Sequence, residues 1–178
     1  MGIEMWAAVL GIAVIFPSVF VYNRLVAARK LAREAYADID VQLRRRADLV
    51  PQLVEAVRGY AAPEKALLTA VTGMRSAALA AQPPAERFGA ERALGAGLKQ
   101  LIALPERYPQ LKADAAFLDL QRRLAEVEDQ LQHARRSYNG AVKDYAMRLE
   151  SFPDTIVANL FRLRPMPLFE TEDRRERR

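Results

Sequence analysis

Apolar residues recur at seven-residue intervals between residues 32 and 60. They form two rows offset by three and four positions, which is the seam along which α-helices pack. One row is Tyr36, Leu43, Val50 and Val57, and the other is Ala32, Ile39, Leu53 and Tyr60, interrupted only by Arg46. The pattern predicts an amphipathic helix with one buried stripe.

A second and longer pattern of the same kind covers residues 117–152. Its first row is Phe117, Leu124, Leu131, Tyr138, Tyr145 and Phe152, and its second is Leu120, Val127, Ala134 and Ala141. Acidic and basic residues alternate outside this seam, as is typical of a solvated helix face. No alternating β pattern of useful length is present. The sequence therefore predicts an all-α fold.

Glycine and proline divide the chain into further helices. Pro51 lies inside the first pattern and predicts a kink, whereas Gly59 and Pro63 mark a break. Helix is expected again up to Ala81 and, after a turn at residues 82–84, over residues 85–104. Short connections favour antiparallel neighbours. We therefore expect a long antiparallel bundle of about four helices.

Residues 5–23 contain no charge and are long enough to cross ~30 Å of hydrocarbon as a helix. A cleaved signal peptide would need a basic start and small residues at the cut site, and neither is present. We therefore expect an N-terminal transmembrane helix in a single-pass protein. The expected domains are a transmembrane anchor (1–23), a helical-bundle domain (24–152) and a C-terminal apolar segment with a charged tail (153–178).

Four cations follow this span, whereas only Glu4 precedes it. These lipid-surface candidates are Arg24, Arg29, Lys30 and Arg33. The positive-inside bias places the N-terminus outside and the main domain in the cytoplasm, in a cytoplasmic (inner) membrane. Membrane is thus one predicted partner. Ala7 and Gly11 form a small-xxx-small pair, which would allow a homo-oligomer.

A straight helix places Arg44, Arg45 and Arg46 roughly 35 Å from the span. At this distance, salt screens their electrostatic attraction to the lipid headgroups. One interpretation is a face laced by salt bridges, with Asp40–Arg44 and Arg44–Asp48 as i,i+4 pairs. Arg46 lies on the seam, so it should reach a carboxylate on another helix or extend its head to water. The alternative is a docking surface for an acidic protein partner.

The last segment is rich in apolar residues that follow the bundle, Phe161 and Phe169 among them. It could cap the bundle, touch the membrane surface or form a docking groove for a partner. Asp154, after Pro153, suits the start of a short helix. Residues 172–178 have mixed charge, and we expect them to be disordered.

Composition excludes several function classes. The formal charge of +5 comes from bases interleaved with acids, which argues against nucleic acid as a partner. The chain has no cysteine and one histidine, His133. The sequence therefore lacks a group of metal ligands at the spacing that a metal site requires. It also lacks a phosphate loop and a nucleophile with a credible base. We expect no enzymatic activity, no catalytic residues and no cofactor.

Several blocks resemble the LemA family. They are EAYADIDVQLRRRADLVPQLVEAVRGYA (34–61), YPQLKADAAFLDLQ (108–121), ARRSYN (134–139) and SFPDTIVANLF (151–161). The resemblance implies a bacterial membrane protein with an external N-terminus, one transmembrane helix and a helical-bundle domain, without an agreed biochemical activity. After Phe161 the family tends to show a Gly-aromatic pair, and this chain has Arg162-Leu163 instead.

Two function hypotheses follow. The first is a membrane-anchored scaffold or adaptor that binds through helix faces and the apolar tail. The second is a membrane-organising protein that binds lipid surfaces through the early cations and the tail. The sequence does not identify the protein partner.

Overall fold

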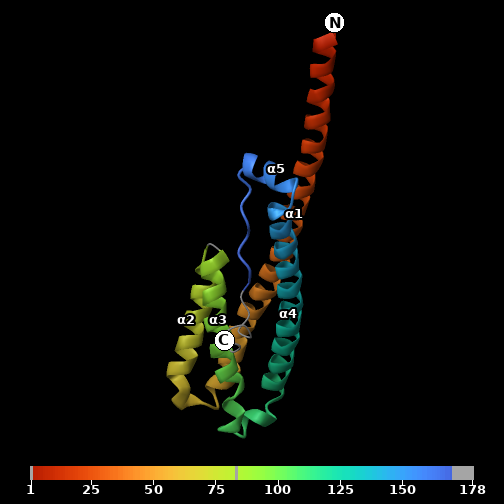
Figure 1. Ribbon diagram of the computed structural model, residues 1–178. Helices are drawn as coiled ribbons and strands as arrows, with labels where there is room; N and C mark the ends of the chain where they lie inside the picture. Colours follow the sequence, from red (N-terminus) through yellow and green to blue (C-terminus); the bar gives the residue numbers. More distant parts are fainter. Residues whose placement is uncertain (1, 83, 170–178) are drawn as a thin grey trace, which may run out of the picture. The chain divides into compact units, whose positions relative to one another are not determined.

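The computed structural model describes residues 2–82 and 84–169; for residues 3–5, 7–14, 84 and 85 it describes the backbone alone. These residues form five α-helices and three 3-10 turns and no strand, so the all-α prediction is confirmed (Figure 1). The helices are α1 Gly2–Arg58, α2 Lys65–Ala80, α3 Pro84–Ile102, α4 Ala115–Glu150 and α5 Asp154–Leu160. The turns are η1 Ala62–Glu64, η2 Leu104–Glu106 and η3 Leu111–Ala113.

The break after the first helix falls where the sequence predicts it, at Gly59 and Pro63. α1 continues through Pro51 and ends at Arg58, after which the N–H groups of Tyr60 and Ala61 both donate to the Val57 carbonyl. α4 begins after Asp114, whose Oδ1 accepts the Phe117 N–H at 2.8 Å. This bond occupies one of the donors that a helix start leaves without a partner, and it lowers the pKa of Asp114.

The predictions for the two ends of the chain concern a membrane span at residues 5–23 and a disordered tail at residues 172–178. Among residues with described side chains, no helix is both long and apolar enough to cross a membrane. Residues 7–14 of the predicted span lie outside that set, and so do residues 172–178 of the predicted disordered tail.

The chain divides into two compact units. The first contains residues 2–36 and 136–168, and the second contains residues 37–135 and Phe169. α1 and α4 therefore contribute to both units, whereas α2 and α3 belong to the second and α5 to the first. This division differs from the expected boundaries at residues 24 and 153, because each long helix carries apolar stripe residues in both units.

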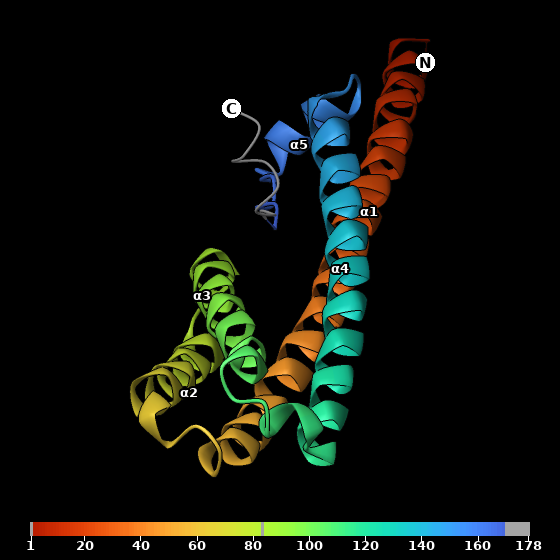
Figure 2. The same ribbon diagram turned by 90° about the horizontal axis from the view of Figure 1, so that it is seen from below.

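Helix directions in the second unit follow from the contacts that cross it. Arg46 reaches Glu128 at 2.9 Å and Gln52 meets Arg123 at 3.4 Å, so α1 and α4 are antiparallel. Figures 1 and 2 show α2 and α3 side by side. A Cβ on Gly97 would lie 2.9 Å from Met74 Sδ and 3.0 Å from Val71 Cγ2, so this glycine lets α3 approach α2 closely.

The predicted seams form the core. Every seam residue from Ile39 to Val57 is buried, and so are Phe117, Leu124, Leu131, Tyr138 and Tyr145. Tyr60 and Phe152 were assigned to the seams incorrectly, because they are 40% and 81% exposed. Each follows the end of its helix, so the seven-residue spacing no longer turns it toward the core.

Candidate interaction surfaces

The three consecutive arginines have three different environments. Successive helix residues point about 100° apart, so neighbours cannot share one surface. Arg44 is exposed, and its Nε lies 3.0 Å from Asp40 Oδ2, which confirms that predicted i,i+4 pair. Arg45 is exposed and lines a groove, whereas Arg46 is 2% exposed. The alternative interpretation, a docking surface formed by all three arginines, is therefore wrong for Arg46.

Arg46 is the centre of a buried ion-pair network. Its guanidinium donates to the Glu91 carboxylate, to the Glu91 backbone carbonyl at 2.9 Å and to Glu128 Oε1 at 2.9 Å. Glu91 is 1% exposed. A buried charge is tolerated only when it is paired and hydrogen-bonded. Of the two fates predicted for Arg46, the structure shows the carboxylate on a neighbouring helix. The Arg46–Glu91 pair is therefore a structural element, inaccessible to a partner.

Sequence reasoning missed Glu91 as the buried partner. On α3, Leu94 and Leu101 are seven residues apart and buried, and Glu91 is seven residues before buried Leu98. Glu91 thus occupies a seam position on α3, as Arg46 does on α1. One unmatched acid and one unmatched base on the seams of two helices would have been a signal for their pairing.

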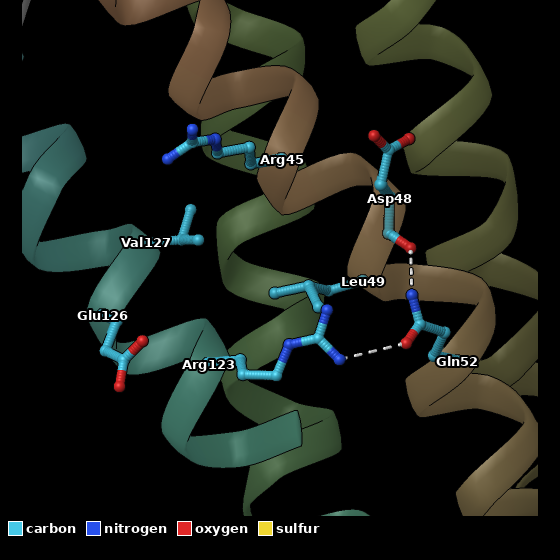
Figure 3. Close-up of a pocket in the computed structure, with 7 residues that line it drawn as sticks. All are labelled: Arg45, Asp48, Leu49, Gln52, Arg123, Glu126 and Val127. Atoms are coloured by element: carbon cyan, nitrogen blue, oxygen red, sulfur yellow. Dashed lines mark hydrogen bonds between the residues drawn. The ribbon is translucent and has the colours of Figure 1, made fainter. Parts of the chain in front are cut away.

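A groove with a volume of about 350 Å³ lies between α1 and α4 in the second unit (Figure 3). We call it the Arg45 groove. It is lined by Arg45, Asp48, Leu49 and Gln52 from α1 and by Arg123, Glu126 and Val127 from α4. Figure 3 shows Leu49 and Val127 between the two helices, with the charged side chains around them. An apolar floor with a polar rim is typical of a binding site.

The rim of the Arg45 groove is partly held in place. Arg123 Nη1 donates to Gln52 Oε1 at 3.4 Å, and Gln52 Nε2 donates to the Asp48 carbonyl at 3.2 Å (Figure 3). The lining contains two cations and two carboxylates. This charge balance favours a partner that carries both signs over a purely acidic one.

The C-terminal segment separates into a buried residue and an exposed one. Phe169 is 1% exposed; its ring centroid lies 4.0 Å from that of Phe88, and the Arg135 guanidinium lies 4.4 Å from the ring. Phe169 therefore caps the core, and its prediction as an interaction residue was wrong. The reason is that Phe88 and Arg135 provide a packing site for this ring. Phe161 remains 53% exposed.

Tyr138 fixes the chain just before Phe169 in the first unit. Its hydroxyl donates to the Pro167 carbonyl at 2.6 Å. Burial, with a smaller contribution from Tyr36, raises the pKa of Tyr138 to about 12. The rings of Tyr36 and Tyr138 pack with centroids 5.8 Å apart. The Pro167 carbonyl is thus held by a neutral phenol within the first unit.

α5 buries one face and exposes the other. Val157 and Ala158 pack against Val21 and Leu25 of α1. The opposite face and the residues next to it form an exposed set that we call the α5 apolar face: Phe152, Ile156, Leu160 and Phe161. Figure 1 shows α5 beside α1. Four exposed large apolar side chains within ten residues of the sequence are a candidate contact surface.

The predicted lipid-surface cations lie on the same stretch of α1. Arg24, Lys30 and Arg33 are exposed and Arg29 is half-buried. Lys30 Nζ lies 3.5 Å from Glu34 Oε1 on the helix surface. Contact of these residues with lipid stays a prediction.

The described side chains offer no group of three His, Cys, Asp or Glu residues able to hold a metal ion. His133 is exposed on α4.

Comparison with known families gives one finding. The model of the LemA family matches residues 35–178, which is most of the chain and includes all of the second seam and all but Ala32 of the first. No curated protein matches the sequence.

Proposed function

Because the chain belongs to the LemA family, we propose that it is a non-enzymatic scaffold or adaptor anchored in the bacterial cytoplasmic membrane. Residues 5–23 would form the single span, since they carry no charge over a length that matches the hydrocarbon layer. The cations that follow the span favour a cytoplasmic position for the remainder of the chain. The membrane thus sets the location, and the helical units provide the binding surface.

The Arg45 groove is the observation that carries the scaffold proposal. Its floor is apolar, and its rim offers arginines and carboxylates from two antiparallel helices. An amphipathic helix of a partner fits such a groove, with an apolar side chain on the floor and charges of both signs at the rim. The partner that we propose is therefore a protein helix.

The groove has a firm base, which favours binding without rearrangement. Leu49 is buried in the core of the second unit, and Arg46, one turn earlier on α1, is held by Glu91 and Glu128. Ordering the binding surface in advance reduces the entropy that association must overcome.

Site-specific crosslinking in intact cells tests this proposal. A photoreactive residue replaces Arg45 or Arg123 in the groove, and the matched control replaces Arg122, which is 70% exposed on the same helix but outside the groove. We expect one protein to be captured from both groove positions and not from position 122. The double variant Arg45→Glu and Arg123→Glu should then weaken its binding by at least tenfold.

Equal capture at positions 122 and 123 would contradict the groove as the docking site. The membrane part of the proposal has a separate test. Alkaline carbonate extraction should leave the full chain in the membrane fraction, and its release would contradict the anchor.

A further inference from the structure

We infer that the α5 apolar face lies in the headgroup layer of an anionic phospholipid membrane, as a second membrane contact besides the N-terminal segment. This inference rests on the proposed membrane anchor. It assigns one occupant, the lipid surface, to a side-chain set that the first unit leaves exposed: Phe152, Ile156, Leu160 and Phe161.

Position is the first argument. α5 packs on Val21 and Leu25, and the Phe161 ring lies 4.5 Å from that of Tyr22. These α1 residues stand at the end of the uncharged run 5–23. If that run spans the hydrocarbon, Tyr22 lies at the interface, where tyrosine is favoured. The α5 apolar face is then at headgroup depth.

The exposed side chains have the character of an interfacial helix. Ile156 and Leu160 are four residues apart on α5, on the side opposite buried Ala158, and Phe152 directly precedes the helix. Phe152 is 81% exposed and Leu160 is 75% exposed, whereas seam residues of the same sizes are buried. An amphipathic helix of this kind buries its apolar face at the boundary between headgroups and acyl chains.

Charge complementarity is the second argument, and it selects anionic lipid. Exposed Arg162 and Arg164 come shortly after the end of α5. On α1, exposed Arg24 lies between the residues that α5 contacts, Val21 and Leu25, and exposed Lys30 lies five residues beyond Leu25. Basic residues beside an apolar face are attracted to acidic headgroups.

Arg162 has an unusual backbone conformation at the end of α5. Its φ is 52°, in the left-handed region that glycine adopts without strain, and the Leu163 N–H donates to the Ala158 carbonyl to close the end of α5. A cation thus occupies a position where glycine would suit the backbone better. Compared with glycine, arginine at this position adds a positive charge beside the α5 apolar face.

The absence of cysteine from the chain allows a direct test with single spin labels. The full chain, labelled after Leu160→Cys, is reconstituted in vesicles of phosphatidylethanolamine and phosphatidylglycerol. Collisions with oxygen, which enters the bilayer, are compared with collisions with a water-soluble nickel chelate. We expect an oxygen-to-nickel ratio several-fold higher than that of the matched control Leu118→Cys, which is 43% exposed on α4.

A label at Val19→Cys reports on the anchor by itself. An immersed label at position 19 with a label at 160 that is accessible to nickel, or shielded from both agents, would overturn this inference and leave the anchor standing. Nickel access at both positions would overturn the anchor as well.

Charge is tested with Arg162→Gly, which should melt at the same or a higher temperature and reduce the dependence of immersion on phosphatidylglycerol. If the label at 160 were immersed equally in vesicles of phosphatidylcholine alone and in vesicles that contain phosphatidylglycerol, the selection of anionic lipid would be overturned.

Discussion

Arg46 and Glu91 are bound to each other twice: the guanidinium of Arg46 donates to the carboxylate of Glu91 and, at 2.9 Å, to its backbone carbonyl. Both residues are almost completely buried, at 2% and 1% exposure. The pair fixes the rotation and the height of α3 against α1, because a shift of either helix would leave a buried charge without its partner.

Arg46→Met should destabilise the protein by about 3–5 kcal/mol, because it leaves the Glu91 carboxylate buried without a cation. The double variant Arg46→Met and Glu91→Met should recover much of this loss, since Glu128 is partly exposed and can be solvated. Denaturant unfolding followed by circular dichroism measures both. A double variant at least as unstable as the single one would show that the pair contributes packing rather than charge compensation.

Gly97→Ala should destabilise the protein by about 1–3 kcal/mol, because its new methyl group would come within 3.0 Å of Met74 and Val71. Gly140→Ala is the control: it lies in α4 with nothing within 4 Å of a Cβ, so it should stabilise by about 0.5–1 kcal/mol. Thermal melts of the two variants should therefore move in opposite directions. The same sign for both would contradict close packing of α2 and α3 at Gly97.

Asp114→Ala should lower the melting temperature, since it removes the acceptor for the Phe117 N–H at the start of α4 and the acceptor for the Tyr60 hydroxyl. Asp114→Asn keeps an oxygen acceptor and should lose less. Because the pKa of Asp114 is lowered by the Phe117 and Tyr60 hydrogen bonds, its contribution is complete above the ordinary pKa near 3.8 and lost as the pH falls further.

The pH test compares the stability of the natural chain with that of Asp114→Asn. Stability of the natural chain should decline more steeply below pH 4 than that of Asp114→Asn, measured by melting temperature. Parallel pH profiles would argue against the carboxylate as the cap.

Tyr138→Phe should cost about 1 kcal/mol at neutral pH, because the Pro167 carbonyl loses its hydrogen-bond donor. Burial raises the pKa of Tyr138 from 10.0 to about 12, so the folded state favours the neutral phenol. Its contribution is therefore complete below pH 10 and is lost as the pH rises from 10 to 12. The stability of the natural chain should approach that of Tyr138→Phe over this range, and a constant difference would refute the assignment.

Much of the helical framework could be predicted from the sequence alone. A seven-residue row of apolar side chains has one low-energy outcome in water, a helix with that row buried, so Leu43, Val50, Leu124 and Leu131 could be assigned to the core. Gly59 and Pro63 mark a helix end because their effects on the backbone are local.

Tertiary structure alone decided which side chains meet. Arg46 required a carboxylate, but the choice of Glu91 and Glu128 depends on how α3 and α4 are rotated against α1, and no local interaction encodes that rotation. The same holds for Phe169, which is buried against Phe88, while Phe161, equally apolar, stays exposed. The sequence specifies which residues need burial or a partner; three-dimensional packing selects the site, because such contacts join residues far apart along the chain.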